Sequence, residues 1–429
     1  MFERADRGDH AVILHPVFRS TGAEVLDEFQ QLALSAGAEI DGIITAPRNS
    51  KDPRYFVGSG KIEELEALVS ATGVRLILVS HSLSAVQERN IEKICQCRVL
   101  DRAALILDIF AQRAQSYEGK LQVELAQLRR LSTRLVRGWS HLERQKGGIG
   151  LRGPGETQLE TDRRLIGARI RQLNARLEKV SRQREQSRRQ RVRSRAPLVT
   201  LVGYTNAGKS TLFNTLTGSS VDTQDRLFAT LDPTVRRMLD MHCGDVLLAD
   251  TVGFVSALPH ELIAAFRATL QEAREADLLL HVIDASDPYH MERQHDVETV
   301  LESIGADKIP VIRVFNKIDR SNQAVTLRRD DRGRPSSLSV SALNGDGITR
   351  LRAAISDMLA SGRINRWIEL QGSDARLRAQ LFELGVVSEE RIADNGSWML
   401  HIDMPMETAE RLARKYPGDC LKLEAWNPS

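Results

Sequence analysis

The feature that most constrains this chain is an eight-residue stretch of the pattern G-x-x-x-x-G-K-S. It consists of Gly203, Tyr204, Thr205, Asn206, Ala207, Gly208, Lys209 and Ser210. A short apolar run at 198–202 precedes it and a helical pattern at 210–216 follows it, the strand–loop–helix setting of a phosphate-binding loop. Backbone N–H groups would converge there on a polyphosphate, with Lys209 at the β- and γ-phosphates and Ser210 on Mg²⁺. Taken alone, the stretch fits ATPases, kinases and GTPases equally.

A second motif follows a predicted strand at residues 245–249. Its D-x-x-G pattern consists of Asp250, Thr251, Val252 and Gly253. The carboxylate stands where a Walker-B acid would face the metal. We therefore expect Asp250 to hold Mg²⁺ through water.

The interval 219–233 has few core residues, which predicts a switch loop. Its nucleotide-binding residues are expected to be Phe228, Ala229, Thr230, Leu231 and Asp232. Thr230 would join Ser210 as a ligand of Mg²⁺ when the γ-phosphate is present, and Thr234 is the competing candidate. The catalytic residues are then expected to be Lys209, Thr230 and Gly253.

Two further motifs stand at predicted strand ends and select the base. The first consists of Asn316, Lys317, Ile318 and Asp319, and the second of Ser341, Ala342 and Leu343. The Asp319 carboxylate can accept both guanine N1–H and the exocyclic amine, whereas adenine lacks this donor pair. Because a site built on such bonds rejects the wrong base strongly, the four motifs together predict a protein that binds GTP.

Length and composition indicate a soluble protein of several domains. The 429 residues exceed what one hydrophobic core supports. The chain is 41% hydrophobic and 27% charged, and it has no apolar stretch long enough to span a bilayer. The first residues do not form a secretory signal, and the four cysteines are scattered. We expect reduced cysteines and a cytoplasmic location.

The small net charge of +3 conceals an uneven distribution. Residues 113–195 contain 22 Lys and Arg against 8 Asp and Glu, a local excess of 14 positive charges that leaves −11 on the rest of the chain. The basic segment predicts a surface that faces nucleic acid on an otherwise acidic body.

Residues 111–195, which include this basic segment, are predicted to form an antiparallel helical hairpin. Apolar residues recur at alternating four- and three-residue steps, with Ser132 filling one position of the seam. They are Leu121, Leu125, Leu128, Leu135, Ile166, Ile170, Leu173, Leu177 and Val180. Glycines and a proline predict a tip loop over about residues 138–158. The loop exceeds what a turn needs and carries Trp139, His141 and several basic residues, which favours a functional surface over a linker. The arginine-rich run at 182–195 indicates a phosphate-tracking stripe rather than a solvated helix face.

The predicted fold class is α/β, in four parts. Residues 1–110 alternate short apolar runs with helical patterns, which indicates a small βαβ domain. After the hairpin, residues 196–365 are expected to form a P-loop GTPase domain with a doubly wound, mostly parallel sheet. Residues 366–429 are predicted to form a small α+β domain, with strands at 398–402 and 421–426.

The motifs G-Y-T-N-A-G-K-S, F-A-T-L-D-P-T, D-T-V-G-F, N-K-I-D and S-A-L follow a hairpin that carries G-G-I-G-L-R-G-P-G-E-T-Q-L-E-T-D-R-R. Together they resemble the HflX family of ribosome-associated GTPases, over residues 10–365. The resemblance implies binding to the large ribosomal subunit and its rRNA, and splitting of stalled or idle ribosomes in the GTP state, with hydrolysis allowing release. It places the hairpin tip toward the peptidyl-transferase region and suggests a role in stress. A GTP-gated ribosome-assembly or stress factor that does not split ribosomes stays open as the alternative.

Phe254 stands where small regulatory GTPases have a water-orienting glutamine. The same replacement is typical of the family that the chain resembles, so catalysis would use the backbone, Lys209, Mg²⁺ and a group supplied in trans. Asn206 could help to hold K⁺, as in related potassium-activated GTPases. Slow intrinsic hydrolysis is expected. We further expect a monomer that does not bind DNA and contacts membranes at most peripherally, through the basic hairpin.

Overall fold

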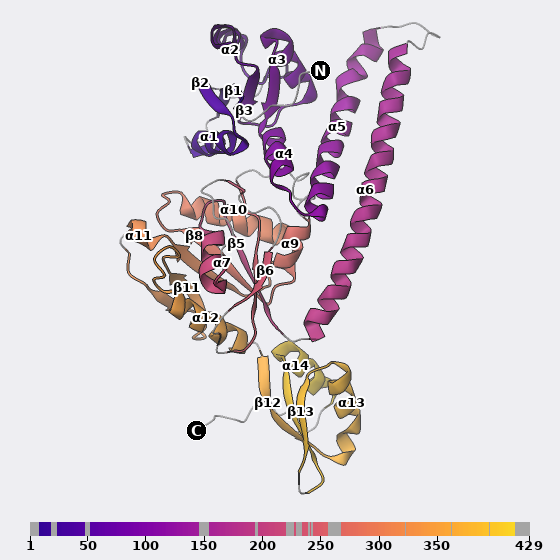
Figure 1. Ribbon diagram of the computed structural model, residues 1–429, viewed down its shortest axis with the longest axis vertical. Coiled ribbons are helices and arrows are strands. Elements are labelled where there is room, and N and C mark those ends of the chain that lie inside the picture. Colours follow the sequence, from indigo (N-terminus) through magenta and orange to yellow (C-terminus); the bar gives the residue numbers. More distant parts are fainter. Residues whose placement is uncertain are drawn as a thin grey trace.

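The computed structural model describes residues 8–18, 24–47, 52–145, 154–193, 196–219, 227–228, 234–238, 241, 243–255, 267–321, 323–361, 363–393 and 395–416. At some positions within helices and strands only the backbone is described. Three sheets and a long helical hairpin make up the chain (Figure 1).

The N-terminal unit is a parallel sheet covered by helices on both faces. Its elements are β1 (His10–Val17), α1 (Glu24–Ala36), β2 (Glu39–Pro47), α2 (Ser59–Thr72), β3 (Leu76–Val79), α3 (Ala85–Cys95), β4 (Arg98–Asp101) and α4 (Arg102–Arg113). The strand order is β2-β1-β3-β4. Since side chains alternate along a strand, Ala11 and Ile13 pack on the side of α1 and α4, while Val12 and Leu14 pack on the side of α2. The predicted βαβ architecture is confirmed.

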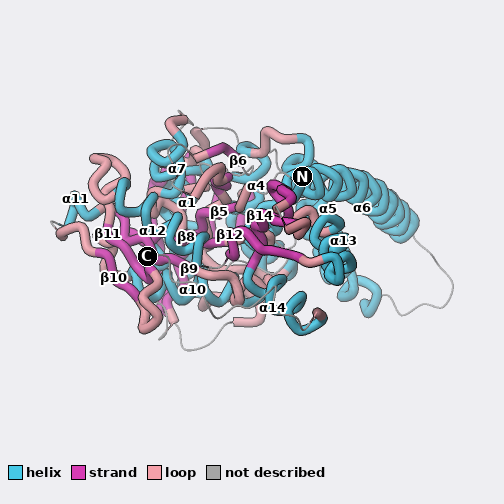
Figure 2. Tube along the Cα trace, turned by 90° about the horizontal axis from the view of Figure 1, so that it is seen from below, coloured by secondary structure: helices cyan, strands magenta, loops and turns pink. Residues whose placement is uncertain are grey.

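The hairpin consists of α5 (Tyr117–Gln145) and α6 (Pro154–Arg193). Leu121, Leu125 and Leu173 form a buried cluster between the arms, with Ile170 and Leu177 partly buried beside it. The two helices run side by side along one flank of the molecule in both views (Figures 1 and 2). The connecting end of the hairpin lies at the same end of the molecule as the N-terminal unit, opposite the C-terminal unit (Figure 1).

The tip loop predicted at 138–158 is shorter in the structure, because α5 continues to Gln145 and α6 begins at Pro154. One glycine, Gly138, costs an α-helix only about 1 kcal/mol. A proline is tolerated in the first helical turn, where its missing N–H would have no partner. Residues 146–153 at the tip lie outside the described residues.

The central unit has a seven-stranded sheet of order β10-β11-β9-β8-β5-β7-β6. Its strands are β5 (Leu198–Gly203), β6 (Thr234–Arg237), β7 (Leu247–Asp250), β8 (Leu278–Asp284), β9 (Val311–Asn316), β10 (Leu327–Arg329) and β11 (Pro335–Ser339). Its helices are α7 (Lys209–Thr217), α9 (Arg267–Arg274), α10 (His290–Ser303), α11 (Ile318–Ser321) and α12 (Ile348–Ser361). The five inner strands are parallel, and the edge strands β6 and β10 are antiparallel. The doubly wound, mostly parallel sheet is as predicted.

The C-terminal unit is an antiparallel sheet of order β12-β14-β13 with helices packed against it. Its elements are β12 (Arg363–Leu370), a 3₁₀ turn η1 (Gly372–Asp374), α13 (Ala375–Glu383), β13 (Val387–Ile392), β14 (Trp398–Pro405) and α14 (Met406–Lys415). This α+β character is confirmed, and the predicted strand at 421–426 lies outside the described residues.

Two of the predicted domain boundaries fall inside elements. The boundary at 365 lies within β12, which pairs along its whole length with β14 and so belongs to the C-terminal sheet. The boundary at 110 lies within α4, whose Phe110 is fully buried. Gly362 directly before β12 was an available boundary signal, whereas no glycine or proline stands between α4 and α5.

Candidate functional site

The phosphate loop connects β5 to α7, and its glycines are sterically required. Gly203 has φ +151°, and a Cβ atom there would lie 2.2 Å from the carbonyl oxygen of Val282. Gly208 has φ +90°, and its Cβ would lie 2.2 Å from Nδ2 of Asn316. Any larger residue would displace the backbone that forms the loop.

Lys209 lies at the centre of this loop. Its Nζ donates to the carbonyl of Tyr204 at 2.6 Å, and the residue is 7% exposed. Burial lowers the pKa of Lys209 to about 8, although the nearby Asp250 carboxylate opposes this shift. Gly253 passes so close that a Cβ there would lie 2.8 Å from Nζ. The structure thus brings together two of the three predicted catalytic residues, Lys209 and Gly253.

Ser210, one of the two predicted magnesium ligands, lies at the start of α7, and Asp250, expected to hold the ion through water, ends β7. Ser210 Oγ donates to Asp250 Oδ2 at 2.8 Å, and Asp250 is 1% exposed. A hydroxyl and a carboxylate are hard oxygen donors, and Mg²⁺ in nucleotide sites typically takes one or two protein oxygens together with phosphate and water. The residues present therefore fit Mg²⁺. When bound, the ion would neutralise charge on the β- and γ-phosphates.

The third predicted catalytic residue, Thr230, lies outside the described residues, as do Ala229, Leu231 and Asp232. The competing candidate Thr234 begins β6 and pairs with Asp250 across the antiparallel ladder. Phe228 is 2% exposed, and its ring packs against Phe110 of the N-terminal unit, with ring centroids 4.6 Å apart.

The D-x-x-G segment is bonded directly to the phosphate loop. Phe254 N–H donates to the Gly203 carbonyl at 3.1 Å, and Thr205 N–H donates to the Phe254 carbonyl at 2.7 Å. The Phe254 side chain is 4% exposed and belongs to a hydrophobic cluster that includes Tyr204 and Val252. An apolar, buried ring can neither hydrogen-bond nor orient an attacking water.

The base-reading motifs meet at the C-terminal ends of β9 and β11. Asp319 Oδ1 accepts a hydrogen bond from Ser341 Oγ at 2.6 Å, which fixes the orientation of the carboxylate. Asn316 bridges two loops, because its Nδ2 donates to the Ala207 carbonyl at 2.9 Å and its Oδ1 accepts from Ala342 N–H at 2.9 Å. The Asn316 side chain therefore joins the phosphate loop to the base-reading loops.

The remaining members of these motifs occupy contrasting surroundings. Ile318 is 4% exposed, whereas Leu343 is 78% exposed. Lys317 has φ +65°, and its Nζ donates to the Asn206 carbonyl at 2.7 Å. The same ammonium lies 2.8 Å from the Asp284 carboxylate.

Asp284 is a residue of the site that sequence reasoning missed. Burial acts to raise its pKa, but hydrogen bonds from Lys317 and Ser286 outweigh burial and lower the pKa below its ordinary value. The carboxylate is therefore ionised and holds Lys317 against the phosphate loop. A signal was available, because Asp284 ends a buried parallel strand, where polar residues of such folds gather around a ligand.

Three family models match successive parts of the chain. The model of a GTP-binding GTPase N-terminal region matches residues 23–111, and that of a GTP-binding GTPase middle region matches residues 113–191. A model described as a 50S ribosome-binding GTPase matches residues 198–317.

Whole proteins resemble the chain over almost all of its length. It is 52% identical over 420 residues to GTPase HflX of Escherichia coli (strain K12), covering 97% of this chain and 99% of that protein. It is 42% identical over 396 residues to GTPase HflX of Magnetococcus marinus, with 91% of each covered. Among solved structures, the complex of SsGBP with GDP matches with a TM-score of 0.47 and 24% identity, covering 82% of this chain and 99% of that one.

Proposed function

The chain belongs to the HflX family of GTPases and hydrolyses GTP, and from this membership we propose that it binds the large ribosomal subunit and splits stalled or idle ribosomes. In the GTP state it separates the subunits, and hydrolysis then allows its release. The proposal includes the binding roles of the phosphate-loop, switch and base-reading residues. It also includes Ser210 and Thr230 as ligands of Mg²⁺, and a K⁺ ion held beside Asn206.

The observation that carries this proposal is the shape of the hairpin. Two helices of 29 and 40 residues lie along the flank of the molecule, and their connecting end lies at the same end of the molecule as the N-terminal unit (Figure 1). The sequence at that end is rich in glycine and basic residues, and α6 continues the arginine-rich run to Arg193. A probe at the end of a long arm, with basic charge along the arm, suits an element that enters an RNA-lined space.

The geometry also suggests that different parts of the chain carry out nucleotide binding and ribosome splitting. No phosphate-loop or base-reading residue lies in the hairpin. Nucleotide binding and ribosome splitting are therefore separable by mutation. None of the described helices is long and apolar enough to cross a membrane.

The test replaces residues 147–153 with a glycine-serine spacer of equal length, which keeps Pro154 and hence the start of α6. Assembled ribosomes are mixed with the wild type or the variant and a non-hydrolysable GTP analogue, and are then sedimented. The wild type should remove the assembled peak, whereas the variant should leave that peak intact and bind GTP with unchanged affinity. Splitting by the variant at the wild-type rate would show that the loop is a linker. A wild type that co-sediments with intact ribosomes and never splits them would identify the non-splitting alternative.

A further inference from the structure

Helix α4 (Arg102–Arg113) touches both the hairpin and the segment that precedes Thr230. It begins at Asp101, at the carboxyl end of β4, and ends next to the central unit (Figure 1). From Asp101 to Phe110 the helix rises about 14 Å, at 1.5 Å per residue. Its two ends make contacts of different chemistry.

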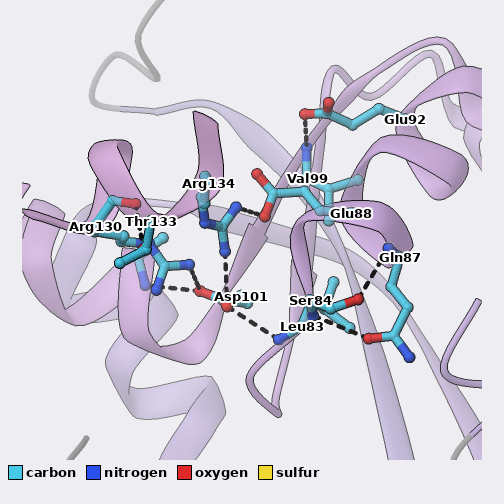
Figure 3. A network of polar contacts seen from close by, with 11 residues as sticks. Leu83, Ser84, Gln87, Glu88, Glu92, Val99, Asp101, Arg130, Thr133 and Arg134 are labelled. Carbon is cyan, nitrogen blue, oxygen red and sulfur yellow. Dashed lines mark hydrogen bonds and ion pairs between the residues drawn. The ribbon is translucent and has the colours of Figure 1, made fainter. Parts of the chain in front are cut away.

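The residue that caps the start of α4, Asp101, connects the helix to the hairpin. Asp101 is 1% exposed, and its carboxylate caps the helix by accepting from Ala104 N–H at 2.9 Å. It also accepts from Arg130 and, at 3.1 Å, from Arg134, both on α5. Arg134 further pairs with Glu88 of α3 (Figure 3). One buried carboxylate thus holds the start of α4 and the hairpin together.

At its other end α4 contacts the switch segment. The Phe110 ring meets Phe228 edge to face, with centroids 4.6 Å apart. Leu227 N–H donates to Ser35 Oγ of α1 at 3.1 Å. Leu227 and Phe228 are 6% and 2% exposed, and Phe228 has φ +57°, a strained conformation for a bulky residue. The N-terminal unit therefore holds these two residues in a defined place.

The anchoring of Phe228 also fixes its contacts on the side of the nucleotide site. The ring of Phe228 lies in the hydrophobic cluster that reaches the nucleotide site. The same hydrophobic cluster contains Phe110, Phe228, Tyr204 of the phosphate loop and Phe254 of the D-x-x-G segment. A displacement of α4 would therefore reach all of these parts through packed side chains, which yield only in discrete steps.

We propose that α4 links the hairpin to the switch segment, so that Phe110 and Ser35 are positioning residues for GTP hydrolysis and Asp101 joins them to the hairpin. The inference rests on the proposed function in taking Thr230 as the magnesium ligand. It does not require ribosome splitting. A force on the hairpin would pass through Asp101, along α4 and through the ring pair to the nucleotide site.

The test measures kcat and KM for GTP hydrolysis by the isolated full-length protein, without ribosomes. Asp101→Asn retains a side-chain acceptor for the helix cap, since Asn and Asp cap helices equally well, but it removes the charge that holds Arg130 and Arg134. Phe110→Leu removes the ring pair and keeps an apolar side chain. Each variant should lower kcat by about 2- to 10-fold, the factor that corresponds to the worth of an aromatic pair. KM should stay within about twofold.

The double variant decides whether the two ends communicate. Substitutions more than about 10 Å apart normally add, so independent effects on kcat would multiply. If α4 is the link, the double variant should be no slower than the slower single variant. Multiplying effects, or an unchanged kcat in both single variants, would overturn the proposal.

Phe29→Leu serves as the matched control. It removes a ring from the same cluster, and among the described residues Phe29 has no ring contact with Phe228. It should lower the thermal midpoint and leave kcat unchanged, which separates positioning from loss of stability. If the Asp101→Asn protein fails to fold, the Arg130→Gln variant is used in its place. Arg130 is a partly exposed partner of Asp101, and its substitution leaves the helix cap made by Asp101 intact. Ribosome splitting is measured separately, so failure of one proposal does not decide the other.

Discussion

Asp319→Asn should change the base preference of the protein from guanine toward xanthine. Ser341 Oγ donates to Asp319 Oδ1 at 2.6 Å, and an amide that keeps this bond must turn its oxygen toward Ser341. Its NH₂ group then occupies the position of Oδ2. With guanine, one carboxylate acceptor is lost and a donor faces a donor. With xanthine, which carries an oxygen in place of the exocyclic amine, the same NH₂ group finds an acceptor.

The magnitude follows from the bonds that change. Losing one hydrogen bond to a charged group costs about 1.5–3 kcal/mol, and leaving a buried donor unsatisfied costs about 1–3 kcal/mol more. The sum of about 3–6 kcal/mol corresponds to a loss of about 10²–10⁴ in GTP affinity. Competition of GTP and XTP against a fluorescent guanine nucleotide measures both Kd values for wild type and variant.

Ser341→Ala is the matched control for this experiment. It removes the hydroxyl that orients the Asp319 carboxylate and leaves both carboxylate oxygens as acceptors. GTP affinity should fall by about tenfold or less, the worth of one hydrogen bond, while the preference for guanine persists. Equal GTP affinity in the wild type and Asp319→Asn would refute the assignment of Asp319 as the base reader.

Two further predictions concern the phosphates. Lys209 has a pKa of about 8 because it is buried, and bound phosphates will raise that pKa. GTP binding above pH 8 should therefore be accompanied by proton uptake, and GTP affinity should fall as the pH rises. Calorimetry at pH 7 and 8.5, in buffers of different ionisation enthalpy, should detect uptake only at the higher pH and none in Lys209→Ala. Because the Phe254 ring is buried and apolar, the rate of GTP hydrolysis should rise strongly when large ribosomal subunits are added. The rate should also be higher in K⁺ than in Na⁺. Full activity of the isolated protein in either salt would reveal a missed catalytic group in cis.

The motifs of the site could be located from sequence because each stands where a buried strand ends. Val202 and Val282 lie in strands that are buried on both faces, so the apolar runs were long enough to identify and their ends marked the ligand edge. The edge strands β6 and β10 have only four and three residues. Their periodicity was too short to recognise.

Helix α4 was missed for a different reason. Its sequence follows β4 directly and begins with an apolar run, which periodicity alone does not assign to strand or helix. The capping residue Asp101 was a usable signal for a helix start. The contact between Leu227 and Ser35 joins residues 192 positions apart. No local pattern encodes such a contact, because it depends on how two separately folded units meet.

The side-chain contacts around the nucleotide site divide it into two parts with different behaviour. Asn316 and Lys317 bond to carbonyls of the phosphate loop at 2.9 and 2.7 Å, so these side chains tie together the loops that hold phosphate and base. Leu227 and Phe228 instead contact the N-terminal unit, through a hydrogen bond to Ser35 and a ring contact with Phe110. A nucleotide can shift an equilibrium only through contacts that differ between two states. The γ-phosphate therefore has little to rearrange in the base-reading loops, and its differential contacts must act on the segment that the N-terminal unit holds.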